Sequence, residues 1–341
     1  MNKSIIVGKN ISELSAICIE NKFPKFHGEQ LYKWLYQKSV NDITKMSNIP
    51  DSLKIIINKK YKLNPLKIER KLKSKNEDTI KYLFETNDHK LIESVSMIDS
   101  GRHTLCISSQ IGCSVDCDFC ATGKMGIIRN LNCGEIIQQL ITISAERKQK
   151  ITNIVFMGMG EPFLNYANVI KACKIINDPS GFNLSSKRIT ISTSGILPIM
   201  KQFILEKHKY KLAISLNASN NSDRDKLIPI NKKWPIEDIL DTIKDYKYQK
   251  YRPIMFEYVL INGVNDSIEN AIELSNLLKK IHCKINIIPY NETEKNYKRS
   301  KNIEKFVTKL NEIKSNYRVL IRWSKGQDID AACGQLATLN E

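Results

Sequence analysis

The sequence predicts an α/β protein: an open, partial TIM-type barrel of six βα units with a small helical domain in front of it. Three observations support this fold class. A chain of 341 residues can bury one large core and a smaller one. Apolar residues recur at helical spacing up to about residue 70. From residue 104 onward, short apolar runs alternate with helical patterns.

The first 72 residues are expected to form the helical accessory domain. Apolar side chains recur every three or four residues over 12–21 and 28–37, which predicts two helices. Asp51 is expected to cap a third helix, because aspartate is a favoured N-cap and apolar residues follow it. This pattern fits both a functional accessory and a structural cap on the barrel.

Residues 73–100 are expected to form a β-hairpin that links this domain to the barrel. Polar and apolar side chains alternate over 79–85 and 91–98, and a polar turn at 86–89 separates the two runs. The barrel domain is then expected to span residues 101–341.

The barrel is predicted from the alternation of strands and helices. The expected strands are 104–108, 153–159, 188–194, 211–217, 255–261 and 284–290. The expected helices between them are 133–147, 165–176, 198–207, 235–249 and 267–281. Six units are too few to close an eight-stranded barrel, so we expect an open one, with residues 318–323 as a last strand. Functional groups should lie at the carboxyl ends of the strands.

Three cysteines follow the first of these strands at the spacing C-x3-C-x2-C: Cys113, Cys117 and Cys120. A structural zinc ion takes four protein ligands, and an iron–sulfur cluster is normally held by four cysteines. Three thiolates therefore favour a [4Fe–4S] cluster with one iron open to another molecule. A zinc site is the alternative, although the nearest later cysteine or histidine is Cys133, too distant for a compact zinc fold.

The composition favours a polyanionic partner. The chain carries 53 Lys and Arg against 36 Asp and Glu, a formal net charge of +17. Basic side chains that neutralise phosphates release counterions, which favours RNA or DNA as a partner. The densest basic runs are 70–75 and 295–305. A general bias toward Lys, Ile and Asn is the alternative explanation of the charge.

The sequence also indicates where the protein works. It has no run of about 18 apolar residues and no secretory signal, so we expect a cytoplasmic protein that does not span a membrane. Nine cysteines in a reducing compartment favour metal or redox chemistry over a disulfide framework.

Small polar residues end several predicted strands. The second strand ends in Gly160 and Glu161, where a glycine admits a ligand close to the backbone and a carboxylate can bind an ammonium group. The third, fourth and sixth strands end in further sets, which include Ser192, Ser215, Leu216, Asn217 and Asn291. Loop caps would explain any one of these sets, but four at equivalent positions favour a ligand site.

Cys106 and Cys333 differ from the remaining lone cysteines. A lone cysteine is usually a small buried apolar side chain. We assign that role to Cys18, Cys133, Cys173 and Cys283. Cys333, by contrast, lies in Ala-Ala-Cys-Gly after the last strand, and a flexible loop of this kind lets a thiol move between two positions, as a carrier does.

Four segments together resemble the RlmN family of bacterial RNA methyltransferases: 104–113, 156–162, 227–231 and 330–336. The cysteine triplet, with Phe119 directly before its third member, also resembles the signature of the radical S-adenosylmethionine (SAM) superfamily. The similarity extends from about residue 28 to residue 338. It implies a barrel of the radical SAM type, an RNA-contacting role for the helical domain, and methylation of C2 of adenine.

The resemblance implies the cofactors and partners as well. One [4Fe–4S] cluster is held by the cysteine triplet, and two SAM molecules are used per turnover, one as methyl donor and one as radical source. Gly160 and Glu161 hold the SAM amino group, and the other strand-end residues named above complete the SAM site. The implied substrates are 23S rRNA (adenine 2503, in the peptidyl-transferase region) and tRNA (adenine 37). The implied reductant is a one-electron donor such as reduced flavodoxin or ferredoxin, and the protein is expected to be a monomer.

The resemblance assigns catalytic roles to Cys333, Cys106 and Glu93. C2 of adenine is electron-poor and does not attack the SAM methyl group, whereas a radical can add to it. Cys333 first receives a methyl group, and a 5′-deoxyadenosyl radical then removes a hydrogen atom from it. The methylene radical adds to C2 and crosslinks protein and RNA. Glu93 corresponds to the base that removes the C2 proton, although its pattern alone predicts a solvated carboxylate, and Cys106 releases the product by forming a disulfide with Cys333.

Two alternatives stay open. A sister family that confers antibiotic resistance uses the same cysteines to methylate C8 of the same adenine; Pro162, where that family tends to have alanine, favours C2. Asn217 departs from the histidine of many relatives but can still hydrogen-bond SAM. A non-catalytic RNA-binding protein with structural zinc would instead bind one zinc ion and cleave no SAM.

Overall fold

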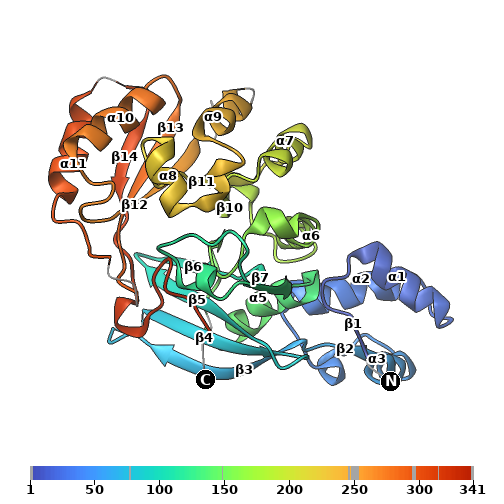
Figure 1. Ribbon diagram of the computed structural model, residues 1–341. Helices are drawn as coiled ribbons and strands as arrows, with labels where there is room; N and C mark the ends of the chain where they lie inside the picture. Colours follow the sequence, from blue (N-terminus) through green and yellow to red (C-terminus); the bar gives the residue numbers. More distant parts are fainter. Residues whose placement is uncertain are drawn as a thin grey trace.

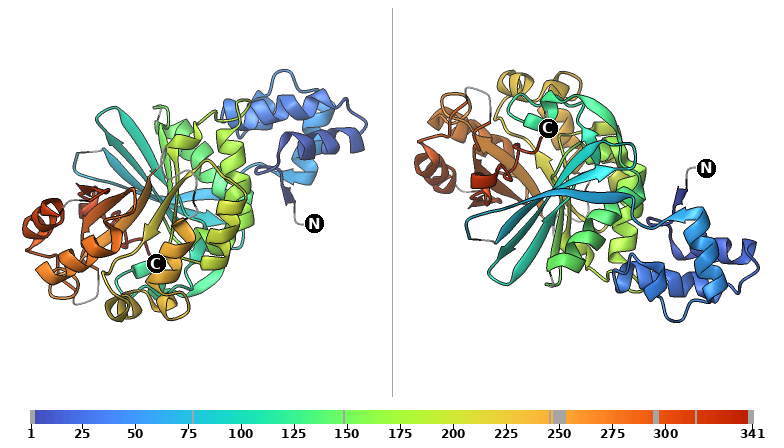
Figure 2. Two further views of the ribbon diagram at one scale, coloured as in Figure 1. Left: turned by 90° about the horizontal axis from the view of Figure 1, so that it is seen from above. Right: turned by 90° about the horizontal axis from the view of Figure 1, so that it is seen from below.

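One twisted sheet organises the molecule. The computed structural model describes residues 3–76, 78–147, 149–244, 246, 253–293, 297–313 and 315–338. Ten strands form the sheet in the order β14-β13-β12-β11-β10-β9-β6-β5-β4-β3. Helices cover its outer side, and a helical module projects from one end of the molecule (Figures 1 and 2).

The barrel half of the sheet consists of parallel strands. They are β6 (Arg102–Cys106), β9 (Asn153–Phe156), β10 (Ile189–Thr193), β11 (Lys211–Ser215), β12 (Ile254–Leu260), β13 (Cys283–Pro289) and β14 (Arg318–Ile321). The predicted strands and the predicted last strand are all present, with ends shifted by a few residues. β14 and β3 stand at the two ends of the order, so the described part of the sheet does not close. The predicted open barrel is confirmed.

Helices connect these strands and pack on the outside. The longer ones are α5 (Cys133–Arg147), α6 (Tyr166–Asn177), α7 (Leu197–Leu205), α9 (Ile236–Lys244), α10 (Ile268–Leu278) and α11 (Ile303–Glu312); α4 (Ala121–Lys124) and α8 (Asn221–Leu227) are short. The helix α11 is not among the predicted helices, because basic residues dominate 295–305; its buried residues Ile303, Phe306 and Leu310 nevertheless have helical spacing. The end of the predicted helix 235–249 lies outside the described residues. Among the described helices, none is long and apolar enough to cross a bilayer.

Three antiparallel strands extend the sheet beyond β6. They are β3 (Leu66–Lys73), β4 (Thr79–Thr86) and β5 (Leu91–Asp99), paired in that order, with β5 paired to β6. The predicted hairpin is therefore β4–β5, but it continues the barrel sheet. The predicted boundaries after 72 and after 100 fall at the end of β3 and inside the β5–β6 turn, where Ser100 and Gly101 have positive φ. The division into three domains itself stays a prediction.

The N-terminal module packs against α5 and α6. It contains β1 (Ser4–Ile5), α1 (Ile11–Glu20), α2 (Phe26–Tyr32), α3 (Asp51–Lys60) and β2 (Tyr61–Lys62). The second predicted helix is α2 followed by a π-helical turn at Lys33–Gln37. Asp51 is not a cap: it is the first residue of α3, and Pro50 precedes it. Lys171 on α6 pairs with Glu13 at 2.7 Å, which helps to fasten the module to the barrel.

Candidate active site

A cavity of about 160 Å³ lies inside the open barrel, at the carboxyl ends of the parallel strands. Most of the predicted site residues line it: Cys113, Cys117, Cys120, Gly160, Glu161, Ser192, Ser215, Asn217 and Cys333. The structure thus brings together residues that the sequence distributes over more than half of the chain. Their common position follows from the parallel strands, whose carboxyl ends meet at one edge of the sheet.

The cysteine triplet forms one wall of this cavity. Its loop begins after β7 (Gln110–Gly112), which pairs with β8 (Ile127–Asn130) in a separate ribbon. Burial raises the pKa of the Cys113 thiol to about 12, and burial together with the other two thiols raises the pKa of Cys117 well above its usual value. A metal centre would bind these groups as thiolates, so its binding would release protons.

The donor set fits the expected cluster. The three thiols share the cavity with Gly160 and Glu161, so a ligand of an open iron has a polar surface beside it. Among the described residues, no group of three or more His, Cys, Asp or Glu side chains is placed to hold a metal ion. The three thiols line one cavity and come from a single loop.

Glu161 is buried beside this wall and held in a fixed orientation. Its Oε2 accepts hydrogen bonds from the Ser194 backbone N at 2.7 Å and from the Ser194 hydroxyl at 2.8 Å. Its Oε1 accepts one from the Phe163 backbone N at 2.9 Å. Burial raises the pKa of the Glu161 carboxyl, and the Ser194 and Phe163 donors oppose that effect. Gly160 has φ +96°, and a Cβ there would lie 2.4 Å from the Gln110 side chain, so the close approach requires glycine.

A buried arginine ties the ends of β10 and β11 together. Arg224 donates from Nη2 to the carbonyl oxygens of Ser194 and Ser215 at 2.7 and 3.0 Å. Its Nε donates to the Leu216 carbonyl at 3.0 Å, and its Nη1 to Asn231 Oδ1 at 2.7 Å. Leu216 does not line the cavity, because its side chain is buried in the core. Arg224 therefore sets the spacing of two strand ends from which the ligand site is built.

Cys106 and Cys333 line a second cavity, of about 280 Å³. Cys333 and Arg322 line both this cavity and the first one, so they stand where the two meet. Burial, and then the proximity of Cys333, raises the pKa of the Cys106 thiol to about 12, while the Arg322 guanidinium opposes the shift. The structure therefore places the predicted pair of catalytic cysteines in one space.

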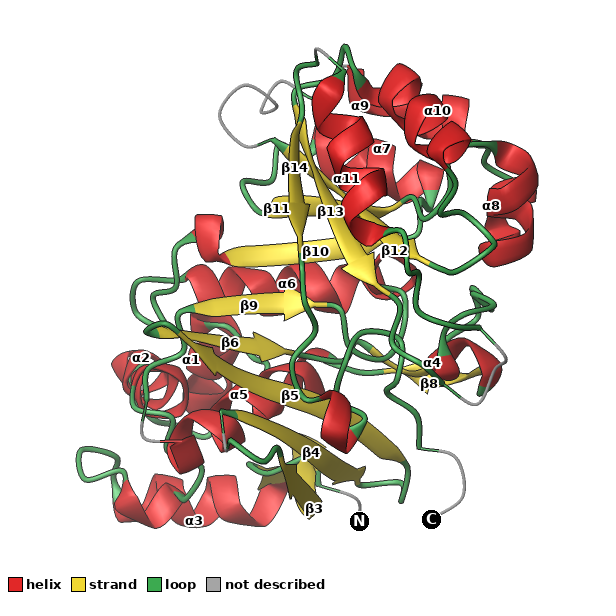
Figure 3. Cartoon of the chain, turned by 90° about the vertical axis from the view of Figure 1, so that its left-hand side faces the viewer, coloured by secondary structure: helices red, strands yellow, loops and turns green. Residues whose placement is uncertain are grey.

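Hydrogen bonds connect the loop that carries Cys333 to neighbouring segments of the chain. The backbone N of Ala121, directly after the cysteine triplet, donates to the Gly334 carbonyl at 2.8 Å. Asn291 does not line the first cavity; its Nδ2 donates to the Cys333 carbonyl at 3.1 Å and to the Ser324 hydroxyl at 2.9 Å. Figure 3 shows the chain after β14 descending across β6 and β5. These contacts hold the Cys333 loop near the cysteine triplet. The sequence, by contrast, predicted a flexible loop.

Glu93 is not the solvated carboxylate that its sequence pattern predicts. The residue is 4% exposed, and its Oε1 lies 3.1 Å from the ammonium of Lys81. Its Oε2 accepts a hydrogen bond from the backbone N of Ala337 at 3.0 Å. Lys81 also donates to the Asp330 carbonyl at 3.2 Å. The Glu93–Lys81 pair is therefore hydrogen-bonded to both ends of residues 330–337, the segment that carries Cys333.

The segment 330–337 separates Glu93 from the two cysteines. Glu93 lines a third cavity, of about 840 Å³, together with Asp330, Gln335 and Ala337. Ala331, Ala332, Cys333 and Leu336 of the same segment line the cavity of Cys106. Because neighbouring residues of one segment face the two cavities, the segment forms the partition between them.

Four residues around these cavities are not predicted from the sequence: Lys81, Arg224, Glu257 and Arg322. Glu257 lies inside the apolar strand β12, lines the first cavity, and has an Oε2 without a hydrogen-bond partner among the described residues. A charge inside an apolar strand was a signal that could have found it. Arg224 gave no such signal, because it stands in a run of charged residues typical of a solvated helix face.

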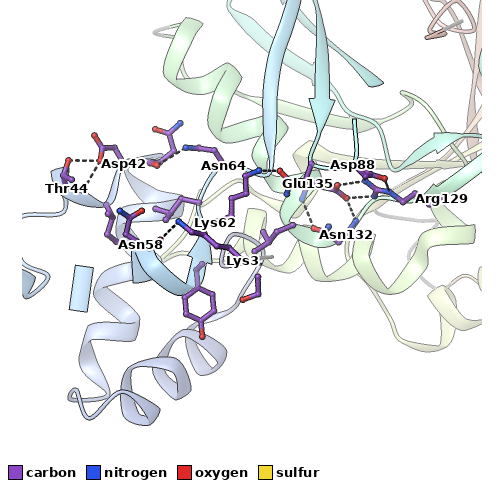
Figure 4. Close-up of a pocket in the computed structure, with 17 residues that line it drawn as sticks. Lys3, Asp42, Thr44, Asn58, Lys62, Asn64, Asp88, Arg129, Asn132 and Glu135 are labelled. Carbon is purple, nitrogen blue, oxygen red and sulfur yellow. Dashed lines mark hydrogen bonds and ion pairs between the residues drawn. The ribbon is translucent and has the colours of Figure 1, made fainter. Parts of the chain in front are cut away.

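A larger cavity, of about 1130 Å³, lies between the N-terminal module and the barrel (Figure 4). Its cationic groups already have partners: Arg129 pairs with Glu135 at 2.8 Å and with Asp88, and Lys3 donates to the Asn58 carbonyl at 2.7 Å. None of the predicted site residues lines it. This cavity therefore holds none of the predicted reactive groups.

Known proteins share both parts of this chain. Residues 107–275 match the radical SAM superfamily, and residues 6–62 match the family described as the ribosomal RNA large subunit methyltransferase N-terminal domain. A probable dual-specificity RNA methyltransferase RlmN of Spiroplasma citri is 40% identical over 340 residues and covers 98% of each chain. One of Clostridium novyi is 42% identical over 97% of each chain.

A solved structure agrees with these relatives. The crystal structure of a radical SAM methyltransferase from Sphaerobacter thermophilus has a TM-score of 0.93 and 37% identity, covering 98% of this chain and 99% of that one. The similarity thus includes the N-terminal module, the barrel and the C-terminal segment.

Proposed function

The chain belongs to the RlmN family of radical SAM RNA methyltransferases, and we propose that it methylates C2 of adenine in 23S rRNA and in tRNA. Membership of the radical SAM superfamily implies SAM and a [4Fe–4S] cluster. One observation supports the proposal most strongly. Cys333 stands where the cavity of the cysteine triplet meets the cavity of Cys106.

The first cavity would hold the cofactors. Cys113, Cys117 and Cys120 would bind the cluster and leave one iron for SAM. When bound, the cluster and SAM supply a methyl group and, after one-electron reduction, a carbon radical. Gly160 and the fixed carboxylate of Glu161 bind the SAM amino group.

The other SAM contacts come from strand ends. Ser192, Ser215 and Asn217 line the cavity and supply hydrogen bonds to the ribose and carboxylate. Leu216 does not line this cavity: its backbone N donates to the Glu257 carbonyl at 3.0 Å and its carbonyl accepts from Arg224, so it fixes the strand end that carries Ser215 and Asn217. Asn291 acts through its hydrogen bond to the Cys333 carbonyl, which sets the position of the methyl acceptor beside SAM.

Cys333 carries the methyl group. Its sulfur would accept a methyl group from one SAM by displacement, which leaves S-adenosylhomocysteine, and the S-methyl group would then lose a hydrogen atom to the radical that a second SAM supplies. The carbon left on Cys333 adds to C2 of adenine and links protein to RNA. A thiol that lines both cavities meets the requirement for a carrier between cofactor and substrate.

Glu93 and Cys106 complete the turnover. Glu93 would remove the C2 proton, which requires segment 330–337 to move, because this segment lies between Glu93 and the cavity of the two cysteines. The adduct would also give one electron back to the cluster. The Cys106 thiolate would then attack the Cys333 sulfur and form a disulfide, the released methylene carbon would take up a proton to become the methyl group of methyladenine, and a two-electron reductant would restore both thiols. Arg322, which lines the same cavity as both thiols, favours the thiolate form of Cys106.

Product analysis tests the proposed function. Anaerobically reconstituted protein with SAM, a one-electron donor such as reduced flavodoxin or ferredoxin, and unmodified rRNA or tRNA fragments should yield 2-methyladenine, mapped by mass spectrometry. Cys333→Ala should yield none. A methyl group at C8 would assign the chain to the reaction of the sister family. A zinc-containing protein that leaves SAM intact would contradict the proposal altogether.

A further inference from the structure

The cavity that holds Cys106 and Cys333 opens to solvent beside a tryptophan. Trp323 lines this cavity, yet 60% of it is exposed. A side chain that both lines a cavity and faces solvent marks its mouth. Among the described residues, Trp323 is the one exposed large apolar side chain that lines this cavity, so its position sets it apart.

One face of β6 leads from this mouth to the reactive thiol. Arg102, Thr104 and Cys106 are spaced two residues apart, so their side chains point to the same face of the strand, and all three line the cavity. Exposure falls along the series: Arg102 is exposed, Thr104 is half-buried and Cys106 is buried. At about 3.3 Å per residue, Cys106 lies roughly 13 Å below the rim.

Arg102, at the exposed edge of this cavity, is an unpaired cation among the described residues. The guanidinium of Arg102 makes no ion pair or hydrogen bond in the part of the chain that the structure describes. Lys325, which lines the same cavity, is already paired with Asp78 at 3.0 Å and with Asp99 at 3.4 Å. Arg102 is therefore the cation at this mouth that is available to a ligand.

We propose that Trp323 and Arg102 form the RNA contact at the mouth of this cavity: the indole stacks on an unpaired base next to the target adenine, and the guanidinium binds a phosphate. The inference rests on the proposed function. Proteins recognise single-stranded RNA by stacking bases on aromatic rings and by neutralising phosphates. A buried thiol reaches an adenine only when the nucleotide is turned out of its stack, which leaves its neighbour's face open to a ring at the rim.

Binding measurements on the reconstituted protein test this contact. The probe is a fluorescently labelled RNA hairpin with an unpaired adenine in its loop, titrated anaerobically and followed by anisotropy. Trp323→Ala should weaken binding about tenfold, and Trp323→Phe should keep most of the affinity, because the phenyl ring still stacks. Leu205→Ala removes another exposed apolar side chain, on α7, and should bind as the wild type does.

Arg102 is tested through the salt dependence. Arg102→Gln should reduce the slope of log Kd against log salt by about one, as expected for the loss of one phosphate contact. Lys201→Gln, which removes an exposed cation on α7, should leave the slope unchanged. The cluster absorbance and the melting temperature show that each variant is folded.

The outcomes separate this inference from the proposed function. The inference would be overturned if Trp323→Ala bound RNA with wild-type affinity and Arg102→Gln left the slope of log Kd against log salt unchanged. Trp323 and Arg102 would then have no role in RNA binding, whether or not they contact a protein partner. Wild-type protein that binds no RNA at all would instead contradict the proposed function.

Discussion

The reaction that we propose depends on three side chains whose surroundings differ. Cys333 faces two cavities, Cys106 is buried in one of them, and Glu93 lies behind the segment that carries Cys333. Each step thus has its own environment, and each can be disturbed separately. In the proposed reaction, movement of one segment, residues 330–337, would connect them.

The pH dependence of product release follows from the burial of Cys106. Its pKa of about 12 means that the group is a thiol at neutral pH, whereas attack on the Cys333 sulfur needs the thiolate. The thiolate fraction rises about tenfold per pH unit below the pKa, so the crosslink should disappear about tenfold faster per unit between pH 7 and pH 9. Acid-quenched single-turnover samples on denaturing gels measure this rate, and a flat profile would show that Cys106 is not the limiting nucleophile.

Glu93→Gln should separate the two halves of the reaction. The amide cannot accept the C2 proton, so formation of methyladenine should fall by about 100-fold or more. Methylation of Cys333 should continue, because Glu93 does not line the cavity where that step occurs. Mass spectrometry of the protein and of the RNA measures the two steps in one sample. Equal loss of both would mean that Glu93 acts on the fold of the segment instead.

Lys81 gives a matched test of how Glu93 is held. Lys81→Met leaves a carboxylate buried without its 3.1 Å partner, which destabilises a protein by about 3–5 kcal/mol. Lys81→Arg keeps a cation at this position and should retain more of the stability and of the product yield. Similar losses in both variants would indicate that the ion pair itself contributes little.

At the scale of elements, strand ends could be predicted from the sequence, but contacts between distant segments could not. The cysteine spacing, Gly160 and Glu161 belong to local patterns, and the βα alternation was enough to place them at one edge of the sheet. Lys81 meets Asp330 only because β4 lies beside the C-terminal segment, and no local pattern of either residue indicates this contact. The hydrogen bond from Asn291 to the Cys333 carbonyl could not be predicted for the same reason.

Arg224 should support the site through two strands at once. Arg224→Met removes the donors of four hydrogen bonds, three of them buried, and unsatisfied buried acceptors cost about 1–3 kcal/mol each. We expect a loss of about 3 kcal/mol or more in the free energy of unfolding, together with weaker SAM binding. Lys226→Gln, on the exposed side of the same helix, should change stability by less than about 0.5 kcal/mol. Denaturant titration distinguishes the two, and wild-type stability in Arg224→Met would contradict this role.

At the scale of the whole molecule, charge and architecture are consistent with an RNA partner. The net charge is +17, and the edge strand β3 exposes Arg70, Lys71 and Lys73. Basic residues on an edge strand also prevent strands of other molecules from pairing with it, so charge alone does not identify an RNA path. The N-terminal module lies at the far end of the molecule from β14 and α11 (Figure 2).

The covalent link between Cys333 and RNA is the most direct test of this account. Cys106→Ala protein, reconstituted and supplied with SAM, reductant and unmodified RNA, should remain attached to the RNA. Mass spectrometry after nuclease and protease digestion should then find a methylene bridge between the Cys333 sulfur and C2 of adenine. Recovery of free RNA and an unlinked Cys333 peptide from that variant, while the wild type methylates the same RNA, would contradict the roles assigned to the two cysteines.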